Sequence, residues 1–121
     1  GLPGIPLAIA SGRRWRLIEP RHRRAAFLEE VVRDLELDCE IVALAAEAAA
    51  RRADLRAAHV LGTARAVADP EVAFALIRPL VGPTGVAAVF LGETSRVPPN
   101  AEEWAPGIAT MPGTGAEGAR G

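Results

Sequence analysis

The sequence predicts an α/β fold, in which helices cover a largely parallel sheet. Segments with apolar residues every three or four positions alternate with short apolar runs, and helix and strand follow each other repeatedly along the chain. The last run, VAAVFL at 86–91, is continuous, as in parallel strands buried on both faces. In such sheets, ligands bind at the carboxyl ends of the strands. Residues that follow the predicted strands are therefore the candidates for a functional site.

The first half of the chain is predicted to begin with a short helix, IPLAIAS, that stops at Gly12. WRLIE at 15–19 alternates bulky apolar and polar residues and is closed by Pro20, which predicts a strand that ends at Glu19. An apolar stripe predicts the next helix over 21–35. The stripe consists of Phe27, Leu28, Val31, Val32 and Leu35.

The middle of the chain continues the alternation. CEIVAL at 39–44 is predicted to be a strand, and the alanine-rich stretch at 45–52 a helix. The apolar run HVLGTA at 59–64 predicts another strand. An Asp-Pro pair at 69–70 starts a helix that is expected to end near Leu80, because Asp caps helices and Pro is tolerated in the first turn.

The C-terminal part gives weaker signals. GPTG at 82–85 is predicted to be a turn before the strand at 86–91. Beyond Gly92, several prolines and a closing run of Gly and Ala predict an irregular, mobile tail over residues 93–121. Residues 1–92 are therefore expected to form the folded domain.

The composition argues against several classes of function. Cys39 is the only cysteine, so an internal disulfide is impossible. His22 and His59 are the only histidines and no cluster has metal-ligand spacing, so we expect no metal site. No apolar run approaches the roughly 18 to 20 residues of a membrane span, and no secretory signal is recognisable. We expect a cytoplasmic protein that does not contact a membrane.

Arginine is concentrated in one short stretch. The net charge of -1 gives no general argument for nucleic-acid binding, but all 14 basic residues are arginine and many lie within residues 13–24. Five of these are candidate contacts to RNA phosphates, and the alternative is a solvated loop and helix start. The candidates are Arg13, Arg14, Arg21, Arg23 and Arg24.

Two features of the first half suit an adenosine cofactor. The chain opens with GLPG, and glycine at a helix N-terminus lets a ligand approach the backbone closely. Glu19 follows about 17 positions later at the end of a predicted strand, where a carboxylate can accept both hydroxyls of a ribose. Each feature alone is also typical of an ordinary turn or a solvated strand end.

Four segments together resemble one known family. GLPGIPLAI, LIEPRHRRAAFLEEVVRDLEL, AAE and TARAVADP follow in the family's order and spacing, and the resemblance runs from Gly1 to about Gly92. The chain is similar to the bacterial small-subunit (16S) rRNA guanine-N7 methyltransferases, also called glucose-inhibited division protein B. The resemblance implies a class I S-adenosylmethionine-dependent, Rossmann-like fold. It also implies S-adenosyl-L-methionine as cofactor and the small-subunit rRNA or 30S subunit as partner.

The resemblance further implies an incomplete fold. In the family, the strand that precedes the GLPG turn is the central one, so this chain is expected to lack the N-terminal part with the central first strand. The two halves of the sheet would then expose unpaired edges. Residues 1–92 are thus expected to be a partial methyltransferase domain, and the chain alone to be unstable or inactive.

Cofactor-binding residues follow from the resemblance position by position. The N7 lone pair of guanine requires alignment and no proton removal, so no general base is expected. The implied cofactor residues are Gly1 and Leu2 at the end of the glycine-rich motif, Glu19 at the ribose, Ala46 and Glu47 beside the adenine, and Arg65 in the cofactor pocket.

Departures from the family pattern leave two alternatives open. Ala45 and Ala48 replace an arginine and an acidic residue beside the adenine, and Leu91-Gly92-Glu93 replaces a Lys-Gly pair. One alternative is a class I methyltransferase that acts on a small molecule or a protein. The other is a truncated, catalytically inactive fragment.

Overall fold

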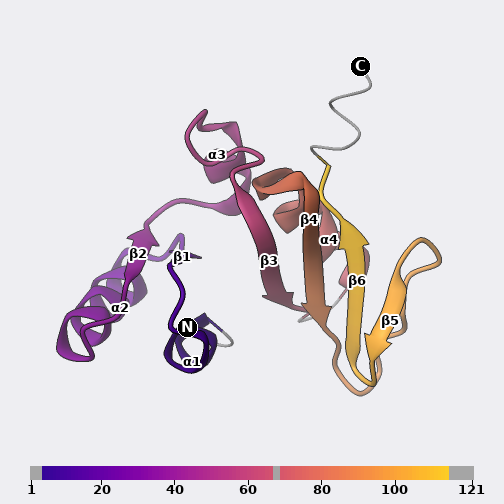
Figure 1. Cartoon of the computed structure of the whole chain (residues 1–121), viewed down its shortest axis with the longest axis horizontal. Coiled ribbons are helices and arrows are strands. Elements are labelled where there is room, and N and C mark those ends of the chain that lie inside the picture. Colours follow the sequence, from indigo (N-terminus) through magenta and orange to yellow (C-terminus); the bar gives the residue numbers. More distant parts are fainter. Residues whose placement is uncertain (1–3, 67–68, 115–121) are drawn as a thin grey trace. The chain divides into compact units, whose positions relative to one another are not determined.

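Two compact units make up the structure. The computed structural model describes residues 4–66 and 69–114, which form one unit within residues 1–49 and another within residues 50–121 (Figure 1). Both units combine helices with strands, so the predicted α/β fold class is confirmed. The family resemblance implies an incomplete sheet, and the described strands indeed form two sheets, of two and four strands, where a doubly wound fold has one.

The first unit is built on two parallel strands. β1 pairs with β2 so that Trp15 lies opposite Cys39 and Ile18 opposite Val42. Helix α1 packs against β1, and α2 packs against β2. The elements are α1 (Gly4–Ser11), β1 (Trp15–Ile18), α2 (His22–Asp34), β2 (Cys39–Val42) and the short α3 (Ala46–Arg51), whose residues fall partly in each unit.

Helix α2 buries only part of its apolar stripe. Ala25 and Leu28 are 3% and 5% exposed and form its buried face. The predicted helix is confirmed, but Phe27 and Leu35 of the apolar stripe are 60% and 52% exposed and are not packed. Successive residues are rotated by about 100° around a helix, and Phe27 therefore points away from the face that Ala25 and Leu28 share.

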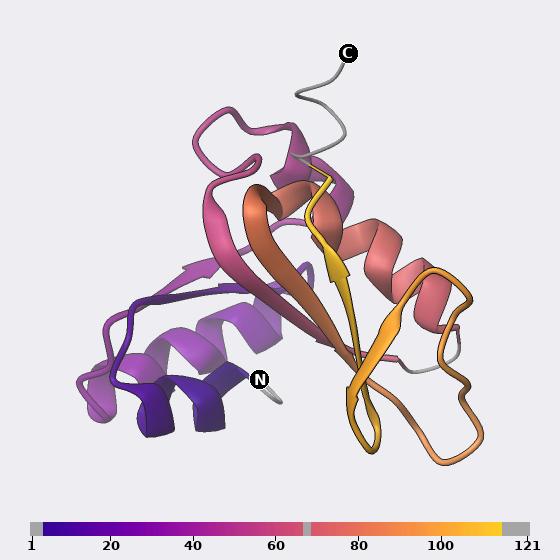
Figure 2. The ribbon, with the colours of Figure 1, turned by 45° about the vertical axis from the view of Figure 1, so that its right-hand side comes forward.

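The second unit holds a four-stranded sheet in the order β3–β4–β6–β5 (Figure 2). β3 and β4 are parallel, whereas β6 is antiparallel to both β4 and β5. Helix α4 packs against β3 and β4. The Asp69 side chain accepts a 2.9 Å hydrogen bond from the Glu71 backbone N–H, which confirms the predicted cap. The elements are β3 (His59–Arg65), α4 (Pro70–Ile77), the 3-10 helix η1 (Arg78–Leu80), β4 (Val81–Phe90), β5 (Glu102–Ala105) and β6 (Ile108–Pro112).

Strand β4 is longer than predicted, because the expected turn GPTG lies within it. His59 pairs with Val81 and Leu61 pairs with Val86, so Val60 alone stands opposite the GPTG segment. The prediction of a turn before the strand is therefore wrong. The chain bulges at this point and pairs with β3 on both sides of the bulge.

The C-terminal region also differs from the prediction. Residues 102–112 contain β5 and β6, so the irregular tail expected over 93–121 is wrong for this part. Pro106 and Gly107 connect the two strands, and Gly107 has the φ of 81° that a type II turn requires at its third position. Pro106 thus belongs to a hairpin turn and does not prevent strand formation. Residues 115–121 lie outside the described part of the chain.

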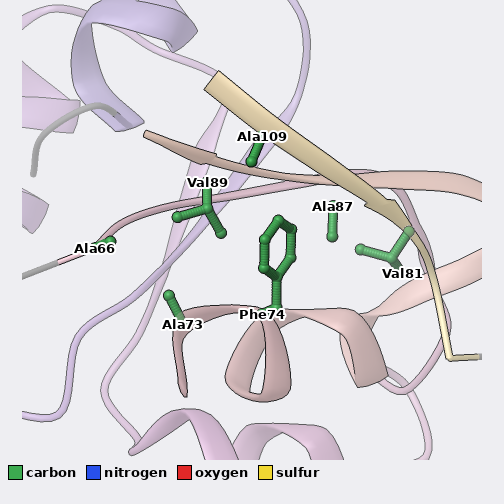
Figure 3. Packing of buried hydrophobic residues seen from close by; sticks show 7 residues of the cluster. All are labelled: Ala66, Ala73, Phe74, Val81, Ala87, Val89 and Ala109. Atoms are coloured by element: carbon green, nitrogen blue, oxygen red, sulfur yellow. The ribbon is translucent and has the colours of Figure 1, made fainter. Parts of the chain in front are cut away.

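The core of the second unit is centred on Phe74 (Figure 3). Phe74 is 2% exposed, and its ring points from α4 toward β4, where Val81 and Val89 are fully buried. Small side chains fill the rest of the cluster, which lets the helix approach the sheet closely. These are Ala66, Ala73, Ala87 and Ala109.

Candidate functional site

Glu19 is a buried carboxylate at the carboxyl end of β1. It is 6% exposed and is the only buried charged residue in the described part of the chain. Its backbone N–H donates a 2.9 Å hydrogen bond to the Val42 carbonyl, which fixes it at the end of the parallel pair. An ionised carboxylate is costly to bury without partners. The groups around Glu19 therefore determine its charge state and which hydrogen bonds its oxygens can accept.

Two arginines that follow β1 are those partners. The Arg21 side chain donates from Nε to Oε2 and from Nη2 to Oε1 of Glu19, both at 3.1 Å, and its backbone N–H donates to Oε2 at 2.9 Å. Arg24 Nε lies 3.6 Å from Oε1. The Glu19 side chain is 8% exposed, whereas those of Arg21 and Arg24 are 69% and 52% exposed. The carboxylate is thus held by two cations that remain in solvent.

These partners determine the charge state of Glu19. The side-chain hydrogen bond from Arg21 lowers the pKa of Glu19 below its usual value, against the opposing effect of burial. The backbone N–H of Arg21 and the charges of Arg21 and Arg24 also lower this pKa. Glu19 is therefore ionised at neutral pH, and its oxygens only accept hydrogen bonds. Such a group can accept the two hydroxyls of a ribose if the Arg21 side chain releases the oxygens.

Ala46 and Glu47 lie at the same end of the two-stranded sheet as Glu19. They begin α3, shortly after Val42, the β2 residue whose carbonyl is bonded to Glu19. The carboxyl ends of parallel strands meet at one edge. Ala46 is half-buried and Glu47 is exposed. The structure therefore brings Glu19, Ala46 and Glu47 to one edge, as the sequence predicts.

Arg65 belongs to the second unit. It is the last residue of β3, it is exposed, and it pairs in register with Phe90 of β4. Its place at the carboxyl end of a parallel strand is the predicted one. Gly1 and Leu2, the remaining predicted cofactor residues, lie outside the described residues.

The predicted arginine cluster is divided by β1. Arg13 and Arg14 precede this strand, whereas the arginines of residues 21–24 follow it, and a strand of this length spans about 13 Å. Arg14 Nε lies 3.8 Å from Asp38 Oδ1 in an exposed pair, which contributes little to stability. The cluster therefore consists of two basic groups, and the second group adjoins Glu19.

An open hollow at the start of α2 was not predicted from the sequence. It has a volume of about 600 Å³ and is called the α2 hollow below. The signal for it is the spacing of the arginines three and four positions before Phe27, because such positions are neighbours on a helix. In the sequence, Phe27 served only as one residue of the apolar stripe that predicts the helix. The hollow is lined by Arg21, His22, Arg23, Arg24 and Phe27.

Three further features concern metal ligands, long apolar helices and the cysteine thiol. Within residues 4–66 and 69–114, no group of three or more His, Cys, Asp or Glu side chains could hold a metal ion. In the same residues, no helix is long and apolar enough to cross a membrane. Burial, with a smaller contribution from Asp38, raises the pKa of the Cys39 thiol, so this thiol is a weak nucleophile at neutral pH.

Comparison with known proteins gives a match at the level of a family. The model of the family described as rRNA small subunit methyltransferase G (GidB) matches residues 1–105. The match continues past Gly92, where the resemblance was expected to end, and includes β5. It therefore includes part of the region that was expected to be an irregular tail.

Individual relatives carry the name ribosomal RNA small subunit methyltransferase G. The protein from a Nocardioides species is 45% identical over 93 residues, which are 76% of this chain and 36% of the relative. The protein from Granulibacter bethesdensis is 39% identical over 95 residues, 78% of this chain and 42% of the relative. The protein from Dictyoglomus thermophilum is 36% identical over 106 residues, which are 86% of this chain and 42% of the relative. The chain thus spans about two fifths of the length of these relatives.

Proposed function

Because this chain belongs to the rRNA small subunit methyltransferase G family, we propose that it takes part in transferring a methyl group from S-adenosylmethionine to guanine N7 of small-subunit rRNA. The observation that carries the proposal is the buried, ionised carboxylate of Glu19 at the carboxyl end of a parallel strand. Nucleoside cofactors bind at this edge of α/β folds, with an acidic residue on the ribose. The relatives' name, ribosomal RNA small subunit methyltransferase G, supports the same class of reaction.

The residues around Glu19 fit an adenosine group. Glu19 offers two acceptor oxygens to the ribose hydroxyls, and the backbone N–H of Arg21 can stay bound to Oε2. The Arg21 side chain is itself 69% exposed, so it can move aside into solvent when the ribose hydroxyls replace its hydrogen bonds to Glu19. Ala46 has a small side chain, which suits a flat adenine, and Glu47 follows it. Gly1, Leu2 and Arg65 complete the proposed set.

The residues of this chain have positioning roles in the proposed reaction. S-adenosylmethionine, when bound, supplies a methyl group on a positively charged sulfur, which the N7 lone pair accepts without loss of a proton. Glu19 fixes the nucleoside end of the cofactor. Arg21, Arg23 and Arg24, with Arg13 and Arg14 as a second group, hold phosphates of the RNA. Alignment of the two partners lowers the barrier, and no residue is assigned as a general base.

Transfer of a labelled methyl group tests the reaction. The matched relatives are longer than this chain, so a chimera is made in which the stretch of this chain that aligns with the Nocardioides protein, over 93 residues, replaces the aligned segment of that protein. With methyl-labelled S-adenosylmethionine, we expect label in the rRNA of naked small subunits. Unlabelled rRNA would contradict the proposal, and label in extracted metabolites or protein would instead support the other class of methyltransferase.

Calorimetric titration with S-adenosylhomocysteine tests the ribose contact. We expect Glu19→Gln to weaken binding about tenfold or more, because charge-assisted hydrogen bonds to the hydroxyls are lost. Glu30→Gln, an exposed change on α2, is the matched control and should bind like the parent. Equal binding by Glu19→Gln would remove Glu19 from the site. Clear binding by the 121-residue chain itself would exclude an inert fragment.

A further inference from the structure

Phe27 is an aromatic side chain held in solvent beside positive charge. Its residue is 60% exposed, while Ala25 and Leu28 on either side of it in the sequence form the buried face of α2. Arg23 and Arg24 lie four and three positions earlier, so their side chains are neighbours of the ring on the helix surface. The ring and these arginines line the same α2 hollow.

The arginines of the α2 hollow differ in whether they already pair with a carboxylate of the protein. Arg21 and Arg24 are both paired with Glu19, and each remains more than half exposed. Arg23 is exposed and has no carboxylate partner among the residues that the structure describes. Glu29 and Glu30 follow within the next turn of α2. Positive charge therefore gathers at the first turn, next to Phe27, and the remaining arginine of α2, Arg33, lies in the last turn.

The start of α2 is also unfavourable for the helix itself. Arg21 is the N-cap residue and makes no capping hydrogen bond with its side chain, and the first turn contains no acidic residue. Unpaired N–H groups give a helix N-terminus partial positive charge, which arginines there reinforce. A capping Ser or Asp would stabilise the helix more. This sequence instead makes the surface attractive to an anion such as phosphate.

We propose that the α2 hollow binds an unpaired RNA segment, with one base stacked on Phe27 and the adjacent phosphates held by Arg23 and Arg24. This inference rests on the proposed rRNA substrate and names the residues that would meet it. Aromatic rings stack on bases whose faces are open, which is the case in single strands, loops and bulges and not inside a duplex. An apolar protein partner is a poorer match, because covering Phe27 would also desolvate the surrounding arginines.

Binding of fluorescein-labelled RNA tests the role of the ring. Anisotropy titrations compare a short single strand with a duplex of the same sequence, using the 121-residue chain and the chimera. We expect Phe27→Leu to weaken single-strand binding about fivefold or more while leaving duplex binding nearly unchanged, and Phe27→Tyr to restore it. Leu35→Ala, an exposed apolar change at the other end of α2, is the matched control. Circular dichroism checks that every variant keeps its helix content.

Arg23→Gln separates charge from stacking. We expect it to weaken single-strand and duplex binding alike and to reduce the salt dependence by about one ion. A 4-thiouridine cross-link should attach to the tryptic peptide that spans residues 25–33, because cleavage after Arg24 and Arg33 isolates Phe27 in this peptide. A cross-link confined to other peptides would overturn the proposal.

The remaining outcomes are also decisive. If the parent binds neither RNA, the stacking proposal and the RNA part of the proposed function both fail, while cofactor binding is judged separately by calorimetry. If the parent binds RNA and Phe27→Leu binds equally well, only the stacking proposal fails. If Phe27→Leu changes the sedimentation of the protein and not its RNA affinity, Phe27 is a protein contact and the proposal is wrong.

Discussion

The Arg21 side chain occupies both carboxylate oxygens of Glu19, with Nε 3.1 Å from Oε2 and Nη2 3.1 Å from Oε1. Glu19 is buried and Arg21 is exposed, so the pair forms where the sheet edge meets solvent. The same two oxygens are the proposed acceptors for the ribose of the cofactor. Arg21 and the ribose therefore compete for one group.

Removal of the competing side chain should improve cofactor binding. We expect Arg21→Ala to bind S-adenosylhomocysteine about two- to fivefold more tightly, because the ribose no longer has to displace the side-chain hydrogen bonds of Arg21. Isothermal titration measures the change, and Arg33→Ala, at the far end of α2, controls for the lost positive charge. Weaker binding by Arg21→Ala would mean that Arg21 assists the cofactor and does not compete with it.

Acid should destabilise the first unit through Glu19. Its pKa is lowered in the folded state, mainly by the Arg21 hydrogen bond. The unfolded state therefore binds more protons, and the free energy of unfolding falls as the pH drops from about 4.5, the ordinary value, through the folded pKa. Arg21→Gln should show a smaller fall over this range because the main cause of the shift is gone.

Urea titrations between neutral and acid pH measure this effect. Trp15 lies in β1 and Trp104 in β5, so a Trp104→Phe background makes fluorescence report on the first unit alone. The reverse background, Trp15→Phe, gives the second unit as an internal control. Identical acid dependence in the parent and in Arg21→Gln would contradict the assignment of the stabilisation to this pair.

Phe74 should dominate the stability of the second unit. Its ring is the largest side chain in the core cluster beneath β4 (Figure 3), and truncation of a buried Phe to Ala costs about 3 to 5 kcal/mol. Val72→Ala, on the exposed side of the same helix, should change stability by less than about 0.5 kcal/mol. Urea unfolding followed through Trp104 compares the two variants, and similar costs would contradict the observed packing.

Gly113 should tolerate no side chain. A Cβ at this position would overlap the carbonyl oxygens of Val81 and Gly82, which are backbone atoms and cannot move independently. We expect Gly113→Ala to lower the free energy of unfolding of the second unit by about 1 to 3 kcal/mol. Gly92→Ala meets only ordinary contacts and is the matched control. Equal stability of the two variants would argue against the close approach of residue 113 to β4.

The sequence predicts the family, the α/β class and the place of Glu19 correctly. Pro20 closes β1 just after the carboxylate, and a strand end is a local feature that sequence patterns reveal. The bonds from Arg21 to Glu19 were not predicted, although the residues are two positions apart, because their meeting depends on how the chain turns into α2. The exposure of Phe27 likewise depends on which face of α2 meets β2.

The C-terminal strands show a different limit of sequence patterns. The many prolines after Gly92 predict an irregular region, yet Pro106 and Gly107 make the tight turn of a hairpin. β6 is stabilised by pairing with β4, a distant segment, and such pairing has no local signal. The bulge at GPTG was likewise not recognisable from the sequence, because turns and bulged strands both contain Gly and Pro, and only the pairing with β3 distinguishes them.

The most direct test of the role of Glu19 in methyl transfer to rRNA is the rate at which the chimera labels rRNA when S-adenosylmethionine is limiting. We compare the parent chimera with its Glu19→Gln and Glu30→Gln variants. We expect labelled rRNA from the parent, a loss of about tenfold or more in kcat/KM for the cofactor with Glu19→Gln, and no change with Glu30→Gln. Unlabelled rRNA from the parent, or an unchanged kcat/KM with Glu19→Gln, would contradict the proposed role of Glu19 in methyl transfer to rRNA.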